Sequence, residues 1–301
     1  MTTAVLAPAP ELGLLENIRS RYGLDATTLK IIAVVLMFID HIHQMFGPVG
    51  VPQWVNMPGR IVFPIFLFLM ADSFHYTRNR KRFLTRLWIA SVAMSIGSFL
   101  ISAMFPYPGV VLMNNAFMTF LVAGLYMWFY DIIRDGVRNH RAGQIVKGIL
   151  LCLVPIITAA PMFFIGTMAA NPNLNVTLLR SLIVVASLIP NIVMVEGGFM
   201  MVVLAVAFYI FREYRLVQIG LFLALSAYIL FANLANPNAI QWMMVFAIPF
   251  MLLYNGKPGR GMKDFFYVFY PAHIWILYII GALLLSFGIT HLTPYYANLF
   301  L

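Results

Sequence analysis

The sequence predicts an all-α, polytopic integral membrane protein with about nine to ten transmembrane helices. Hydrophobic residues make up 62% of its 301 positions and charged residues only 10%, far below the roughly 25% of soluble domains. Apolar windows of about 20 residues, long enough to cross a bilayer, recur along the chain. None alternates like the strands of a barrel, so helices must satisfy the backbone within lipid.

The apolar windows are joined by short polar connections. Residues 1–28 lack the apolar core and cleavage site of a secretory signal, so we expect a cytoplasmic N-terminal segment there and a single transmembrane domain over 29–301. The windows within this domain cover residues 29–46, 61–77, 84–104, 112–133, 148–169, 178–195, 198–212, 216–235, 239–254 and 264–288.

The basic residues indicate orientation. A formal charge of +9 could suggest nucleic acid in a soluble protein, but here Lys and Arg lie mainly in short loops between apolar windows. By the positive-inside rule these loops and the N-terminus are cytoplasmic, which makes the lipid bilayer the expected partner and excludes nucleic acid. The basic groups lie at 19–30, 78–86, 134–147 and 257–263.

The number of crossings depends on the region 178–212. Ten full crossings would place Arg212, Arg215 and the loop 255–263 outside, whereas nine keep them cytoplasmic. We therefore expect one broken or re-entrant segment in this region. Helix-interrupting and polar residues suit that interpretation, namely Pro190, Asn191, Glu196, Gly197 and Gly198.

Ionisable residues interrupt the first apolar window. An Asp at mid-bilayer costs roughly 2.5–3.5 kcal/mol, so Asp40 beside His41 and His43 suggests a function. Lys30 and His41, eleven positions apart, share a helix face, with His41 roughly 16 Å deeper. Asp40 and His43 are neighbours on an adjoining face, where their spacing permits a carboxylate–imidazole pair.

The last apolar window carries a second histidine at similar depth. His273 follows Asp264 by nine positions, or roughly 14 Å of helix rise from the same membrane side. We expect His41 and His273 to line one cavity. The second window brings Asp72 to the cytoplasmic half of the membrane.

Several distinctive sequence blocks extend from the first apolar window to the last. They are LKIIAVVLMFIDHIHQMF (29–46), GRIVFPIFLFLMADSF (59–74), TRLW (85–88), Asn114-Asn115, YNGKPGRGMKDFF (254–266) and FYPAHIWIL (269–277). Together they resemble the TraX family, best known for a conjugation protein that acetylates the N-terminus of propilin. The spacing Lys30-x10-His41 is also similar to the signature of the acyltransferase-three family, and GRIVFPIFLFLM is similar to the heparan-alpha-glucosaminide N-acetyltransferase family. The chain differs from shorter TraX proteins mainly between 148 and 197, where it holds extra apolar residues.

The resemblance implies a transmembrane acyltransferase of the bacterial cytoplasmic membrane. Such an enzyme transfers an acetyl group from cytoplasmic acetyl-CoA to an amine or hydroxyl. A pilin-like peptide, a sugar and a lipid are the candidate acceptors. No metal is expected.

Acyl transfer requires a base and stabilisation of the oxyanion. We predict His41 as the base, with Asp40 or Asp72 holding its tautomer. His273 and Tyr270 would donate to the oxyanion, or His273 would be the base with His41 assisting.

The donor's phosphates require cations. Guanidinium groups bind phosphate with paired, charge-assisted hydrogen bonds. Lys30 is expected to contact the pantetheine phosphate at the cytoplasmic mouth. The candidate nucleotide contacts are Arg78, Arg80, Lys81, Arg82 and Arg86, whose alternative role is only to fix orientation.

Three further alternatives stay open on the sequence. Transfer is either direct or through an acyl-histidine. A proton-coupled transporter would also carry intramembrane Asp and His, although it predicts repeat symmetry that the sequence lacks. A scaffold without chemistry would tolerate loss of both His41 and His273.

Overall fold

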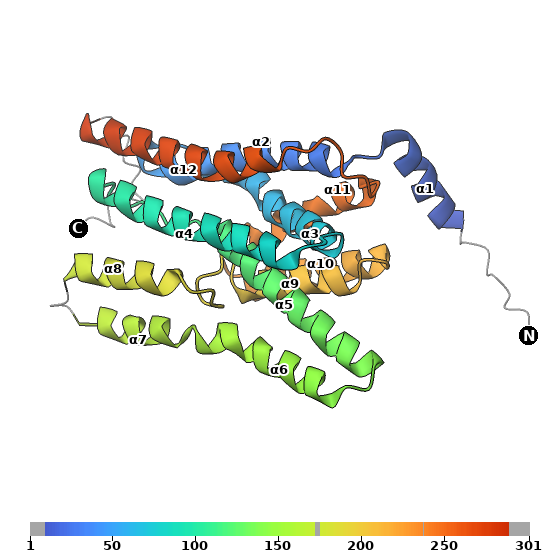
Figure 1. Cartoon of the computed structure of the whole chain (residues 1–301). Coiled ribbons are helices and arrows are strands. Elements are labelled where there is room, and N and C mark those ends of the chain that lie inside the picture. Colours follow the sequence, from blue (N-terminus) through green and yellow to red (C-terminus); the bar gives the residue numbers. More distant parts are fainter. Residues whose placement is uncertain (1–9, 172–174, 237, 289–301) are drawn as a thin grey trace, which may run out of the picture.

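The computed structural model describes residues 10–171, 175–236 and 238–288, which fold into a bundle of helices (Figure 1). Within these ranges the only strand-like pairing is an isolated bridge between Leu24 and Tyr254. Seven described helices are long and apolar enough to cross a membrane. The prediction of an all-α polytopic membrane protein is therefore confirmed. Residues 1–9 of the predicted N-terminal segment lie outside the described part.

The helices follow the apolar windows with one addition, the helix α1 before residue 26, which no apolar window predicted. Three 3₁₀ segments, η1 (Gly47–Val49), η2 (Gln53–Ile61) and η3 (Gln241–Ala247), interrupt or extend the α-helices. The α-helices are α1 (Pro10–Tyr22), α2 (Ala26–Phe46), α3 (Val62–His75), α4 (Arg80–Met104), α5 (Ala116–Arg138), α6 (Ala142–Ile157), α7 (Ala160–Ala169), α8 (Val176–Ser187), α9 (Phe199–Ile210), α10 (Arg215–Ala232), α11 (Ile248–Leu253) and α12 (Lys263–Ser286).

Short polar side chains begin four of these helices. Asp25 accepts a hydrogen bond from the Thr28 backbone N–H at the start of α2. Asn79, Asn115 and Asn175 do the same at the starts of α4, α5 and α8. Each cap satisfies backbone donors that a helix terminus leaves free, which explains why these helices begin where they do.

The centre of the bundle is formed by α3 and α5, the most buried of the long helices. Both pack against α9, and α3 also packs against α2. Two helices from opposite ends of the chain, α2 and α12, lie together on one side, with α6 and α7 on the opposite side (Figure 1). The first and last long helices described are therefore neighbours.

The region 178–212 is broken, as predicted. Helix α8 ends at Ser187 and α9 begins at Phe199, and residues between them are not helical. The Asn191 side chain accepts from the backbone N–H groups of Val193 and Met194 and so satisfies part of this loop. If α8 and α9 count as one interrupted crossing and η3–α11 as another, the described segments give the nine crossings that the basic residues favour.

A clamp ties the start of α2 to the loop before α12. The Leu24 N–H donates to Leu253 and the Ala26 N–H to Lys257, at 2.9 Å each. The Thr27 hydroxyl, at 2.6 Å from the Arg260 carbonyl, adds a third link. These bonds set the register between α2 and α12 at the end of the bundle that carries α1, called the α1 end below. The opposite end, which carries the loop 105–115, is called the far end.

Candidate active site

Two buried histidines from α2 and α12 meet inside the bundle. His41 Nδ1 lies 2.7 Å from His273 Nε2, and the ring centroids are 4.9 Å apart. Only 4% of the surface of His41 and 5% of that of His273 is exposed. Since 232 positions separate them in the sequence, the packing of α2 on α12 creates this pair. The structure therefore brings the two imidazoles together at the depth that the helix rise indicated.

The hydrogen bonds around the pair define its proton arrangement. His273 Nδ1 lies 2.6 Å from the Phe269 carbonyl, which can only accept, so Nδ1 carries the proton. Neutral His273 then has its lone pair on Nε2 and accepts from His41 Nδ1–H. By the same rule, neutral His41 has its own lone pair on Nε2. The chain from Phe269 through His273 thus leaves His41 with a free basic nitrogen.

His41 lines a cavity of about 410 Å³ but His273 does not, so the expectation that both histidines line one cavity is wrong. Apolar side chains from α2, α3, α5 and α12 form most of the wall. The polar residues that face this cavity, called the His41 cavity below, are Lys30, Asp40, His41, Arg60, Ser73, Glu196, Gln241, Tyr267 and Tyr270.

The predicted shared face of Lys30 and His41 is present, because both residues line the His41 cavity. Lys30 Nζ lies 5.8 Å from the Phe266 ring centroid, at the start of α12. Phe83 and Leu87, from the start of α4, line the same end. The cavity thus runs from the α1 end toward His41, about 16 Å deeper along α2.

Asp40 does not hold the tautomer of His41. Its carboxylate forms an ion pair with Arg60 at 2.8 Å, and the second terminal nitrogen of Arg60 donates to Gln241 at 3.1 Å. His43 is not hydrogen-bonded to Asp40 either, because its Nδ1 lies 3.0 Å from the Val51 carbonyl. The sequence pattern favoured contacts of Asp40 with His41 and His43 because helix spacing relates only residues of the same helix, here α2.

Tyr270 contacts a carboxylate that the sequence suggested only as a helix interruption. Its hydroxyl donates to Glu196 at 2.9 Å and accepts from the Ala116 N–H at 3.0 Å. The Glu196 carbonyl also accepts from Thr119. Tyr270 is therefore already engaged and is not free to donate to an oxyanion. An acid beside Gly197 inside an apolar region was the signal that could have found Glu196.

Asp72 lies away from the histidine pair. Tyr254 donates to its carboxylate at 2.7 Å, and Asp72 does not line the His41 cavity. The expectation that Asp72 could orient His41 is therefore wrong. Asp72 instead links α3 to the residue after α11.

The predicted basic cluster divides into two groups. Arg80 is held by Asp131 of α5 in an ion pair of 2.6 Å and also contacts Tyr209, so it is not free for phosphate. Arg86 lies close enough to Tyr267 of the His41 cavity to interact with it electrostatically. The members that remain exposed to solvent at the α1 end are Arg78, Lys81, Arg82 and Arg86.

The described fold and site define a polytopic membrane protein in which imidazoles from α2 and α12, helices far apart in the sequence, meet beside a mostly apolar cavity that holds a few polar residues. Residues 25–281 match the family described as TraX protein, and the chain belongs to that family. The resemblance of the sequence blocks to the TraX family is therefore confirmed. Neither the comparison with curated proteins nor that with solved structures found a significant match.

Proposed function

We propose that this protein is an acyltransferase that moves the acetyl group of acetyl-CoA to an amine or hydroxyl acceptor within the membrane. The observation that supports this most is the hydrogen-bonded chain from Phe269 through His273 to His41. It gives His41 an unprotonated Nε2 beside a cavity, which is what a general base requires. Membership of the TraX family is consistent with this chemistry.

In the direct route, His41 removes the acceptor's proton. The acceptor N–H or O–H bond breaks, and its proton moves to His41 Nε2 while the acceptor atom bonds to the thioester carbon. The C–S bond then breaks, and the coenzyme A sulfur takes the proton from His41. His273 accepts from His41 Nδ1–H throughout, which keeps the ring oriented and stabilises the imidazolium.

Arg60 is the best candidate for stabilising the oxyanion. Its Nε is buried and has no hydrogen-bond partner in the described part of the chain, while its two terminal nitrogens bind Asp40 and Gln241. Arg60 also lines the His41 cavity. The guanidinium group lies in the cavity wall, and its charge and unpaired Nε–H suit the negative charge that develops on the thioester oxygen once the side chain turns toward it. Arg60 thus takes the role that the sequence had suggested for Tyr270 or His273.

The donor would enter from the α1 end, which the positive-inside rule makes cytoplasmic. Its nucleotide phosphates would contact the exposed group Arg78, Lys81, Arg82 and Arg86. Lys30 would contact the pantetheine phosphate, since it lines the same cavity as His41 about three turns away. The N-terminus would then be cytoplasmic, and the membrane would be the bacterial cytoplasmic membrane.

A two-step route uses the same atoms. His41 Nε2 would attack the thioester carbon, coenzyme A thiolate would leave, and the acetyl-imidazole would then react with the acceptor. Parallel initial-rate lines together with an isolable acetylated enzyme would support this route. Intersecting lines without a labelled enzyme would support direct transfer.

The test is turnover of labelled acetyl-CoA by the purified protein with amine and hydroxyl acceptors. His41→Ala should lower kcat by about 10²-fold or more, because the base is lost. The matched control is His43→Ala, since His43 lies on the same helix, binds the Val51 carbonyl and does not line the cavity. The proposal would be rejected if the wild-type protein released no coenzyme A. It would also be rejected if His41→Ala released coenzyme A as fast as the wild type. Substrate uptake into liposomes without acyl-CoA would favour a transporter.

A further inference from the structure

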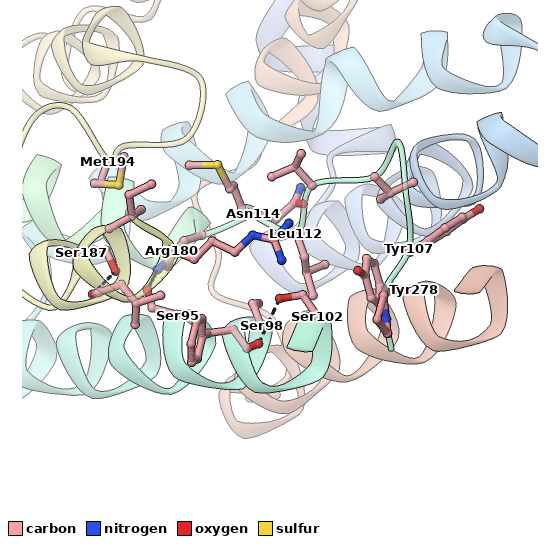
Figure 2. A pocket seen from close by; sticks show the side chains of 18 of the residues that line it. Ser95, Ser98, Ser102, Tyr107, Leu112, Asn114, Arg180, Ser187, Met194 and Tyr278 are labelled. Carbon is pink, nitrogen blue, oxygen red and sulfur yellow. Dashed lines mark hydrogen bonds between the residues drawn. The ribbon is translucent and has the colours of Figure 1, made fainter. Parts of the chain in front are cut away.

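A second cavity, of about 610 Å³, opens at the far end of the bundle and is called the far cavity below (Figure 2). Its walls come from the end of α4, the loop 106–115, α8 and Tyr278 of α12. Most of the wall is apolar and includes Phe99, Val110 and Ile183. None of the residues assigned above to acyl transfer lines this cavity.

Arg180 is the only charged residue among the described residues that line the far cavity. Figure 2 shows its side chain extending from α8 into the cavity. Within the described ranges Arg180 forms no ion pair with a carboxylate. Arg180 is exposed and lies in the second turn of α8, so its positive charge is available to an anion that enters this cavity.

Hydroxyl groups on α4 face the same space. Ser95, Ser98 and Ser102 are spaced by three and four residues, which places them on one helix face. Ser98 accepts from Trp275, and Ser102 donates to the Phe99 carbonyl. A guanidinium group with nearby hydroxyls suits the oxygens of a phosphate group, whereas it would repel a cationic amine.

The far cavity reaches the neighbourhood of the histidine pair. Asn115 lines the far cavity and donates to Ser95, while the next residue, Ala116, lines the His41 cavity. The Ala116 N–H donates to Tyr270, three positions before His273 on α12. Neighbouring residues at the start of α5 therefore line the two cavities. Along α12, Tyr278 lies about 7–8 Å beyond His273.

We propose that the far cavity binds the phosphate-bearing headgroup of an anionic amphiphile, which is the acceptor of the proposed acyl transfer. Arg180 would bind the phosphate, the serines would accept or donate hydrogen bonds, and the apolar walls would cover the start of the hydrocarbon part. An amphiphile suits this site because the cavity lies between α4 and α8, two helices with exposed apolar side chains such as Leu100 and Val185. The acceptor would enter from the end opposite to acetyl-CoA. This inference rests on the proposed function for the acceptor role, but not for binding.

Binding to the purified protein in a neutral detergent tests the site without turnover. The probes are dioctanoyl phosphatidylglycerol, dioctanoyl phosphatidylcholine, inorganic phosphate and an acidic peptide, titrated by microscale thermophoresis. We expect the anionic lipid to bind at least about 10-fold tighter than the zwitterionic one, with Arg180→Gln removing that preference and Arg180→Lys keeping part of it. Arg138→Gln, an exposed arginine at the α1 end outside both cavities, is the matched control.

A second variant keeps the test valid if Arg180→Gln fails to fold. Ser102→Leu retains Arg180 but fills part of the far cavity. It should therefore also lower the affinity for the anionic lipid. Equal binding of both lipids, or a preference that survives both variants, would overturn the proposal. Tighter binding of the acidic peptide, or of inorganic phosphate alone, would overturn the choice of an amphiphile.

The acceptor role has its own readout. His41→Ala should still bind the anionic lipid, because the base is not part of the far cavity. In a working transfer assay, Arg180→Gln should raise the KM for the acceptor and leave the KM for acetyl-CoA unchanged. If the wild-type protein shows no transferase activity but binds the anionic lipid through Arg180, the proposed function is rejected and the proposed lipid site stands. Transfer with an unchanged acceptor KM would reject the acceptor role alone.

Discussion

Asp40 and Arg60 form an ion pair in the wall of the His41 cavity, and Gly59 is the residue that allows their approach. The two side chains are 15% and 24% exposed, and their charged atoms lie 2.8 Å apart. The Asp40 carboxylate occupies the space where a Cβ on residue 59 would stand. The position of the Arg60 Nε donor therefore depends on a glycine one residue away.

Gly59→Ala should disrupt this pair and lower transfer. The added methyl group would overlap Asp40, so the ion pair must shift, at a cost of about 1–3 kcal/mol in the free energy of unfolding. We expect kcat to fall by about 10-fold or more, because small misplacements of a catalytic donor are costly. Thermal unfolding in detergent and turnover assays measure the two effects.

Gly220→Ala is the control for that substitution. Gly220 lies within α10, and a Cβ there would meet no heavy atom within 4 Å. Alanine is favoured over glycine within a helix, so this variant should be as stable as the wild type or more so. Equal activity of Gly59→Ala and Gly220→Ala would show that the Asp40–Arg60 pair does not matter for transfer.

His273 should act as a positioning residue. His273→Gly removes the acceptor of the His41 Nδ1–H bond, so His41 loses its fixed tautomer and orientation. We expect kcat to fall by about 10²-fold or more, by analogy with loss of a tautomer-fixing partner, while the KM for acetyl-CoA changes little. Added imidazole should restore part of kcat by filling the space that His273 occupied. A loss that imidazole leaves unchanged, accompanied by a fall in melting temperature, would indicate a structural role only.

Helix geometry explains which part of this site could be predicted from the sequence. Lys30 and His41 share a face because their spacing is close to three turns, and His273 reaches similar depth because α12 starts at the same end. Both results need only the rise and period of a helix. The broken segment at 178–212 was also predictable, because its Pro and Gly residues oppose helix formation.

Partners on other elements explain what the sequence could not predict. Arg60 reaches Asp40 because the 3₁₀ segment η2 packs along α2, and no periodic pattern predicts that contact. Glu196 reaches Tyr270 from a non-helical loop whose path is set by tertiary packing. Arg80 looked equivalent to Arg86 along the chain, yet only Arg80 faces Asp131 of α5. Which arginine of the cluster forms an ion pair and which stays exposed depends on the side chains of the neighbouring helix.

Arg60→Lys should separate the two proposed roles of Arg60, the ion pair with Asp40 and hydrogen-bond donation from Nε. Lysine keeps a positive charge for Asp40 but has no equivalent of the Nε donor, which is unpaired in the described structure. We expect folding to be retained and kcat to fall by about 10²–10³-fold, as for loss of an oxyanion donor. Arg60→Gln should in addition destabilise the fold by about 3 kcal/mol, because Asp40 would lose its cation. Wild-type kcat in Arg60→Lys would contradict the assignment of Nε.

Arg86 and Arg80 should differ in their effects, although both belong to the basic cluster at the α1 end. Arg86→Gln should raise the KM for acetyl-CoA by about 3–10-fold without changing kcat, because an exposed phosphate contact is lost. The increase should vanish with S-acetylpantetheine as donor, since this donor lacks the nucleotide phosphates. Arg80→Gln should instead lower the melting temperature, because the buried Asp131 would keep only Arg134 as an ion-pair partner among the described residues. The same KM increase with S-acetylpantetheine would show that Arg86 acts on the fold and not on the donor's phosphates.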